Sequence, residues 1–302
     1  MKFINKTTSD LAEILNADNP QDCDLLSLSD SLIDLATKEN EILPSRAFNV
    51  RKSEEYKNSQ FLSQYSAGLN LIENNFITGV SNLPHQSKGA STERLDLLLN
   101  QWGVYHLHLS ENIESDGFCS RTGPVLFCCF DHETVYFLDI LEHGSRHATV
   151  WVNEDILRVV KNNWPKHLNR YEMKGVLGLA QTYTQEEKMK LRKGHVNATL
   201  EIDGVYYMSP GMGLAGSGHS VRYVYNTQRI IKHIAKVVSS CVDNGDYPLL
   251  DGKSLKDFYP KNDRYAKRPA ILRLKKSGTG LALYEQRSAS VLHFYDLFFP
   301  IF

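Results

Sequence analysis

The chain has 302 residues, of which 42% are hydrophobic and 23% are charged, and its 34 Lys and Arg almost balance its 35 Asp and Glu. This is the composition of a soluble globular protein long enough for two domains, and a net charge of −1 argues against a general nucleic-acid coat, though not against a local basic patch. No apolar run reaches the length of a membrane span, the N-terminus lacks a signal-peptide core, and the five cysteines have no Cys-x-x-Cys spacing, so we expect a reduced, cytoplasmic protein.

Residues 1–44 are acidic and carry apolar residues at helical spacing, in Ser9–Leu15 and again in Leu28–Ala36. We interpret them as an acidic helical N-terminal segment, which is either solvated or covers a basic site. A further helix is predicted for Phe61–Val80, and the polar residues 81–91 predict a loop that leads into the next block.

The block from Leu95 to Pro165 has the densest strand pattern in the chain. A helix that Thr92 caps and Gly103 ends precedes the strand Val104–Leu109. In this strand His106 and His108 share one face, while the Tyr and Leu residues share the other face, which we expect to be buried. The remaining predicted elements are an apolar strand Val125–Phe130, a hairpin turn Asp131–Glu133, a strand Val135–Leu141, a short strand around Ala148–Val152 and a helix Asn153–Trp164.

Two features of this block carry a resemblance. Arg121 stands just before the strand that begins Pro-Val-Leu-Phe, and the strand Val-Tyr-Phe-Leu-Asp-Ile runs into His143-Gly144. With its helix and small antiparallel sheet, the block resembles the RelE/HigB-like mRNA interferases of the barnase–EndoU–colicin–RelE class, which implies a bacterial toxin or phage-defence ribonuclease. Those toxins are much shorter than this chain, and their basic C-terminal active-site residues have no assigned counterpart here. The block also resembles a group of bacterial proteins from which no activity follows.

A glycine-rich segment follows two clear local patterns. Thr184–Glu187 predicts a capping box for a helix that Gly194 ends, and Asp203-Gly204 predicts a hairpin. In the segment Pro210–Ser220, backbone amides could contact a substrate, or the segment could be a flexible hairpin loop. The strand-like run Val221–Tyr225 and the lack of Gly-Lys-Ser/Thr argue against a nucleotide-binding loop. The candidate substrate contacts here are Gly213, Gly216, Gly218 and His219.

The C-terminal part turns basic after a helix that Asn226 or Thr227 would cap. From Lys253 on, basic and aromatic residues are interleaved, a pattern that suits a phosphate backbone with stacked bases and equally a plain soluble surface. The candidate substrate contacts of this part are Lys267, Arg268 and Arg273. A hairpin is predicted between strands Ile271–Leu274 and Leu281–Tyr284, and the apolar end 290–302 predicts a buried strand or an interface.

Three hypotheses compete for the histidine block. In the first, a metal-independent ribonuclease, His106 or His108 is the general base on a ribose 2′-hydroxyl and Arg121 balances the charge that develops on the phosphate. His143 or His147 then protonates the leaving oxygen, and Arg146 belongs to the same candidate set.

The second hypothesis is a metal site, because His106-x-His108 and a third imidazole suit zinc or iron. The cupin pattern fails, since Glu111 is too near the pair and Glu114 too far. One half of a two-histidine phosphoesterase pattern is present at 147–150. In the third hypothesis the histidines satisfy buried hydrogen bonds, and the protein is a non-catalytic module that binds nucleic acid or protein.

Together these patterns predict an α+β protein. We expect an N-terminal helical segment (1–44), a central domain with an antiparallel sheet, flanking helices and the His/Arg site (45–180), and a second, mixed α+β C-terminal domain (181–302). The expected partners are RNA, a protein such as an antitoxin, or a second copy of the chain, and not a membrane. No cofactor is expected in the first hypothesis, and a divalent metal such as zinc in the second.

Overall fold

The computed structural model describes residues 3–19, 23–91, 96–247, 253–254 and 269–298, without the side chains of 90–91 and 145–148. Two compact units divide the chain: one comprises residues within 41–222, and the other combines residues within 1–40 with residues within 223–299. The domain limits predicted at 44 and 180 follow chain order, whereas one of these units combines an N-terminal with a C-terminal part of the chain. The α+β class predicted from the sequence is confirmed.

The first unit is built on a four-stranded sheet in the order β2-β5-β4-β3. The predicted antiparallel strands β3, β4 and β5 are present, and β2 adds to β5 in parallel. Periodicity did not indicate β2, because its sequence Asn-Val-Arg-Lys is short and charged. The strands are β2 (Asn49–Lys52), β3 (Tyr105–His108), β4 (Pro124–Phe130) and β5 (Thr134–Glu142).

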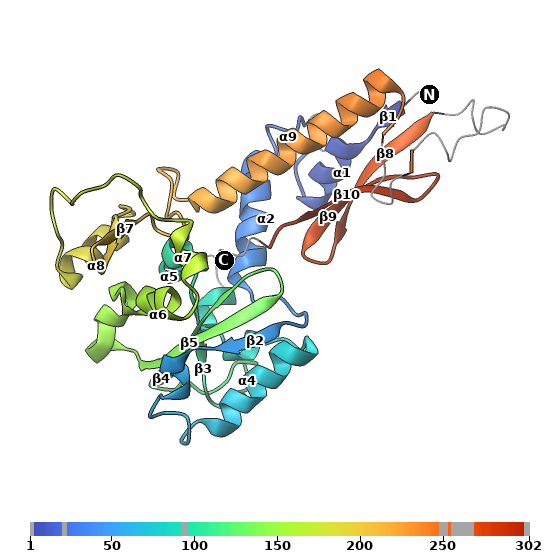
Figure 1. Cartoon of the computed structure of the whole chain (residues 1–302). Helices are drawn as coiled ribbons and strands as arrows, with labels where there is room; N and C mark the ends of the chain where they lie inside the picture. Colours follow the sequence, from blue (N-terminus) through green and yellow to red (C-terminus); the bar gives the residue numbers. More distant parts are fainter. Residues whose placement is uncertain (1–2, 20–22, 92–95, 248–252, 255–268, 299–302) are drawn as a thin grey trace. The chain divides into compact units, whose positions relative to one another are not determined.

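Both faces of this sheet are covered (Figure 1). On one face, Phe76 of α4 (Ser66–Thr78) packs edge to face on Phe130 and Phe137. Helix α4 comes so close to the end of β3 that a Cβ on Gly68 would lie 1.8 Å from the Leu109 carbonyl oxygen. The opposite face, which carries His106 and His108, packs against α5 (Leu97–Trp102), η3 (Ser145–Val152) and α6 (Asp155–Asn163). The two histidines therefore point away from the Tyr105 face, as predicted, but into a second buried layer.

Two predicted hairpin turns and one predicted helix cap are confirmed. Asp131 Oδ1 accepts the amides of residues 133 and 134 in the β4–β5 hairpin, and Thr184 forms the predicted capping box of α8 (Gln185–Lys193). Asp203 and Gly204 both have positive φ in the turn between β6 (Leu200–Ile202) and β7 (Val205–Tyr207). The other short helices of this unit are α3 (Glu54–Lys57), α7 (Pro165–Asn169), η1 (Leu83–His85) and η2 (Lys88–Ser91).

Four local predictions were wrong. The run Ala148–Val152 lies in the helix η3, and Val221–Tyr225 forms the first turns of the long helix α9 (Val221–Asn244), so no cap occurs at 226 or 227. Both runs are rich in β-branched and aromatic residues, whose strand preference tertiary packing overrides. Helix α5 is capped by Asp96, whose Oδ1 accepts the Leu98 and Leu99 amides, while Thr92 lies outside the described residues.

The second unit packs helices α1 (Thr7–Ile14), α2 (Ser29–Glu41) and α9 with a four-stranded sheet in the order β1-β8-β9-β10. The predicted hairpin is present as β8 (Ala270–Ser277) and β9 (Gly280–Glu285), followed by β10 (Ser290–Asp296). The strand β1 (Phe3–Asn5) pairs with β8 in parallel, which ties the N-terminal segment to this sheet. Throughout the described chain, no helix is both long and apolar enough to cross a membrane.

Candidate functional site

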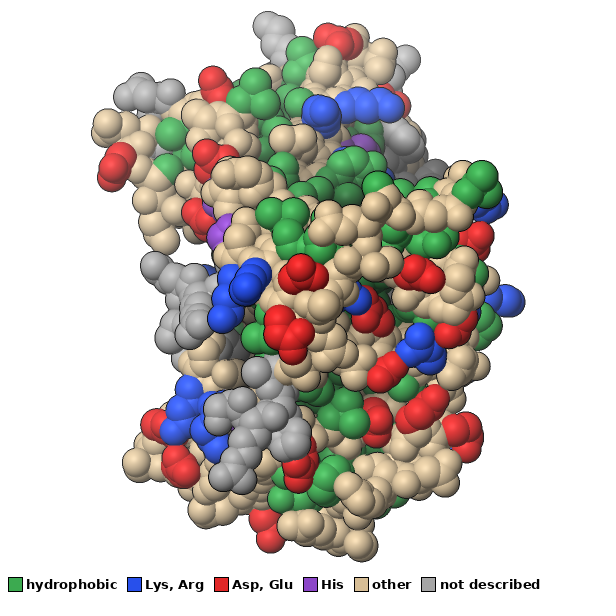
Figure 2. Space-filling model, turned by 90° about the vertical axis from the view of Figure 1, so that its left-hand side faces the viewer, with side chains coloured by type: hydrophobic (Ala, Val, Ile, Leu, Met, Phe, Trp, Pro, Cys, Tyr) green, Lys and Arg blue, Asp and Glu red, His purple; other side chains and the backbone are tan. Residues whose placement is uncertain are grey.

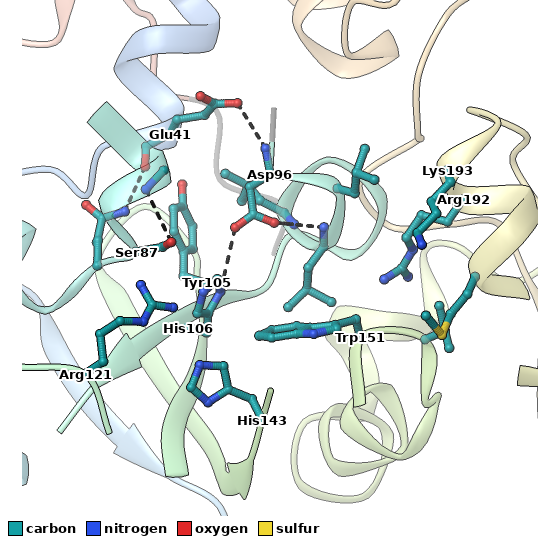
Figure 3. A pocket seen from close by; sticks show the side chains of 17 residues that line it. Glu41, Ser87, Asp96, Tyr105, His106, Arg121, His143, Trp151, Arg192 and Lys193 are labelled. Carbon is teal, nitrogen blue, oxygen red and sulfur yellow. Dashed lines mark hydrogen bonds and ion pairs between the residues drawn. The ribbon is translucent and has the colours of Figure 1, made fainter. Parts of the chain in front are cut away.

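A cavity of about 350 Å³ lies in the first unit, beside the strand β3 (Figure 3). It brings together His106 of β3, Arg121 from the loop before β4 and His143 from the end of β5. Three of the residues predicted from the sequence to be catalytic thus line one cavity. Its other lining residues are Glu41, Gln86, Ser87, Gly89, Asp96, Leu97, Leu98, Leu99, Tyr105, Trp151, Val152, Met189, Arg192 and Lys193.

His106 is paired with a carboxylate. Its Nδ1 lies 3.7 Å from Oδ2 of Asp96, whose other oxygen caps α5, and 12% of the His106 side chain is exposed. Burial lowers the pKa of His106 below its ordinary value; the charge of Asp96 opposes this effect, and His143 and Arg121 reinforce it. A neutral imidazole with its proton on Nδ1, toward Asp96, leaves the lone pair of Nε2 free to act as a base.

His143 is held in the matching tautomer. Its Nδ1 donates to the backbone carbonyl of Gly123, and its own amide donates to the same oxygen at 3.1 Å. The remaining nitrogen, Nε2, is therefore available for proton transfer. The ring centroids of His106 and His143 are 6.5 Å apart, and Trp151 contacts both, at 4.9 Å from His106 and 5.7 Å from His143. Trp151 therefore packs against both imidazoles and helps to set their spacing.

The contacts of His108 do not suit the general-base role that was predicted for it. It is 1% exposed, and its Nδ1 accepts the amide proton of Thr122 at 3.2 Å, so its own proton is on the buried Nε2. Burial, reinforced by the charge of Arg121, lowers the pKa of His108 to about 3. An imidazole without a free lone pair is a poor general base. We assign it a positioning role, because it fixes the segment that carries Arg121.

Positive charge predominates among the described groups that line the cavity. The lining contains three basic side chains, Arg121, Arg192 and Lys193, and two carboxyl groups, those of Asp96 and Glu41. Burial raises the pKa of Glu41 to about 7, an effect that the Asp96 amide opposes and the Asp96 charge reinforces, so Glu41 is partly protonated at neutral pH. An anion is the ligand that this balance favours.

The raised pKa of Glu41 predicts a pH-dependent stability. The folded protein keeps a proton that the unfolded chain, with a pKa of 4.5, loses, so stability should fall as the pH rises from 4.5 to about 7. Glu41→Gln cannot ionise and still offers an oxygen to the Asp96 amide, 3.3 Å away. We expect the variant to match the wild type near pH 4.5 and to exceed it by about 1 kcal/mol above pH 7, after allowance for solvent screening.

Urea unfolding at pH 4.5 and pH 8 measures this difference. Glu133→Gln, at an exposed carboxylate in the β4–β5 turn, is the matched control and should show no such pH dependence. Equal stability of wild type and Glu41→Gln at both pH values would contradict the prediction.

The same geometry bears on the metal hypothesis. Across the described chain, no group of three or more His, Cys, Asp or Glu side chains is arranged to hold a metal ion. His108, the second histidine of the predicted three-imidazole set, uses its lone pair for the Thr122 amide. The set therefore lacks the free nitrogen that a metal needs from it.

The glycine-rich segment contributes no residue to the lining of this cavity, and its backbone amides are largely used within the unit. The amides of Gly211 and Gly213 donate to the carbonyls of residues 101 and 100, and a Cβ on Gly211 would lie 2.3 Å from the carbonyl oxygen of residue 100. This packing gives the segment a structural role. Substrate contact by Gly213, Gly216, Gly218 and His219 stays a prediction.

The other predicted residues are placed as follows. Arg146 and His147 lie in η3, with side chains outside those described, and Lys267 and Arg268 lie outside the described residues altogether. Arg273 lies in the other unit, where its Nε bonds both carboxylate oxygens of Asp10, at 2.8 and 3.0 Å. This ion pair gives Arg273 a structural role, and its contact with a substrate stays a prediction.

The sequence did not point to Asp96, Trp151, Arg192 or Glu41. Asp96 carried one usable signal, since an Asp before the run Leu-Leu-Leu is a good helix cap. Nothing local indicates that its second oxygen faces His106.

Comparison of the chain with protein-family models, with curated proteins and with solved structures found no match. Function is therefore inferred from the site itself.

Proposed function

We propose that this protein is an endoribonuclease that cleaves RNA by metal-independent acid–base chemistry in the cavity of the first unit. The observation that carries the proposal is that two imidazoles, His106 and His143, and the Arg121 guanidinium line one cavity. In-line attack at phosphorus needs a base and an acid on opposite sides of the phosphate. The two imidazoles are separate groups with ring centroids 6.5 Å apart, so one can serve the 2′-oxygen and the other the 5′-oxygen.

The proposed reaction uses these three groups in turn. His106 Nε2 takes the proton of the ribose 2′-hydroxyl, and the 2′-oxygen attacks phosphorus as the bond to the 5′-oxygen breaks. Protonated His143 gives its proton to that 5′-oxygen, and Arg121 balances the charge on the phosphate oxygens. The products are a 2′,3′-cyclic phosphate and a 5′-hydroxyl.

On the face shown in Figure 2, basic and acidic side chains are interspersed, in keeping with a net charge of −1. The setting that we propose, a bacterial toxin or phage-defence effector in the cytoplasm, is supported by the resemblance of residues 95–165 alone.

The test is to incubate the purified protein with a single-stranded RNA, with and without EDTA, and to identify the ends produced. We expect cleavage that survives EDTA, yields 2′,3′-cyclic phosphate ends and stops where a 2′-deoxynucleotide replaces the ribonucleotide. Cleavage that requires a divalent cation would favour a metal-dependent phosphoesterase, and binding without cleavage would favour a non-catalytic module.

A further inference from the structure

Arg192 of α8 is a buried cation at the edge of the cavity. It is 8% exposed, its Nε donates to Gln101, and its guanidinium lies 4.6 Å from the centre of the Trp102 ring. Its Nη1 is buried and has no hydrogen-bond partner in the described chain. Burial lowers the pKa of Arg192 to about 10, which still leaves it charged at neutral pH.

The carboxylates of Asp96 and Glu154, which act on the charge of Arg192, have other partners. Asp96 and Glu154 are near enough to raise the pKa of Arg192. However, Asp96 caps α5 and faces His106, and Glu154 pairs with Lys188. A buried guanidinium without its own counter-ion costs stability, and a bound anion removes that cost.

The position of Arg192 indicates which anion. Figure 3 shows Arg192 and Lys193 on one side of the cavity and Arg121 on the other, with His106 and Trp151 between them. A polynucleotide whose scissile phosphate lies at Arg121 carries its next phosphate one nucleotide away. Guanidinium groups bind phosphate through paired, charge-assisted hydrogen bonds.

We propose that Arg192 and Lys193 form a second phosphate site, which holds the phosphate next to the scissile one in single-stranded RNA. This proposal rests on the proposed function, because that function places the scissile phosphate at Arg121. If the second site exists, the smallest ligand that fills both sites is a dinucleotide with one additional terminal phosphate.

The test uses dinucleotides that cannot be cleaved because both sugars are 2′-deoxy. Three are compared by titration calorimetry: one without a terminal phosphate, one with a 5′-phosphate and one with a 3′-phosphate. We expect the wild type to bind one phosphorylated form at least about tenfold more tightly than the plain dinucleotide. Arg192→Met should lose this preference. Arg121→Met should bind all three dinucleotides more weakly but should still prefer the phosphorylated form.

Thermal unfolding shows whether the variant is folded. Arg192→Met keeps an unbranched stem against Trp102 and removes the unpaired charge, but it also loses the hydrogen bond to Gln101, so its melting temperature is used only to establish folding. If it fails to fold, the exposed Lys193→Met takes its place and should reduce the preference.

No preference in the wild type, no dinucleotide binding at all, or a preference that survives Arg192→Met would each overturn the second site. The proposed function is judged separately, by RNA cleavage. A phosphate preference without RNA cleavage would support the second phosphate site and refute the ribonuclease proposal. RNA cleavage without a phosphate preference would support the ribonuclease proposal and refute the second phosphate site.

Discussion

Replacing His106 with alanine is expected to lower the rate of RNA cleavage at least about 100-fold, the usual contribution of one general base. The variant loses the nitrogen that removes the 2′-proton, while Arg121 and His143 still line the cavity. The measurement is the initial rate on an oligonucleotide with a single ribonucleotide. His132→Ala, at an exposed histidine in the β4–β5 turn, is the matched control and should keep the wild-type rate.

The pH dependence of the wild type gives a second check on His106. A general base works only when it is deprotonated, so protonation of His106 should limit the rate on the acidic side. Burial lowers the pKa of His106 below the ordinary 6.5, and the base therefore stays neutral into more acidic solution. The acidic limb should have its midpoint below pH 6.5. A midpoint above 6.5, or a His106→Ala variant with the wild-type rate, would rule out this assignment.

Much of the central sheet could be predicted because its patterns are local. Alternation placed the two histidines on one face of β3, and the Asp131 turn joined β4 to β5. An arginine before β4 and a histidine after β5 must then meet at the same end of the sheet, because the two strands are antiparallel. Local patterns and antiparallel pairing are therefore enough to bring Arg121 and His143 to the same end of this sheet, beside the histidines of β3.

The residues that complete the cavity could not be predicted in this way. Trp151, Arg192 and Glu41 come from η3, from α8 and from the end of α2, and no periodic pattern links those segments to β3. The sequence also could not show that His106 and His108 have different environments. Their sequence contexts are alike, and they differ only because Asp96 faces one imidazole and the Thr122 amide faces the other.

Asp96→Asn is expected to lower the cleavage rate about 100-fold or more without unfolding the protein. Asparagine caps a helix as well as aspartate does, so α5 should keep its N-terminus. Its amide group, however, donates toward Nδ1 of His106, which favours the tautomer with the proton on Nε2 and removes the free lone pair of the base. Because the charge of Asp96 also raises the pKa of His106, its loss should move the acidic limb of the remaining activity to lower pH.

Asp96→Ala separates the two roles of this residue. Alanine removes the cap, which should cost about 1 kcal/mol of stability, but it leaves His106 free to adopt either tautomer. The alanine variant should therefore be less stable than the asparagine variant and yet cleave RNA faster. Rates and urea unfolding measured on both proteins decide the matter. If activity instead follows stability across the wild type and the two variants, Asp96 acts only as a helix cap, and His106 does not depend on it for its tautomer.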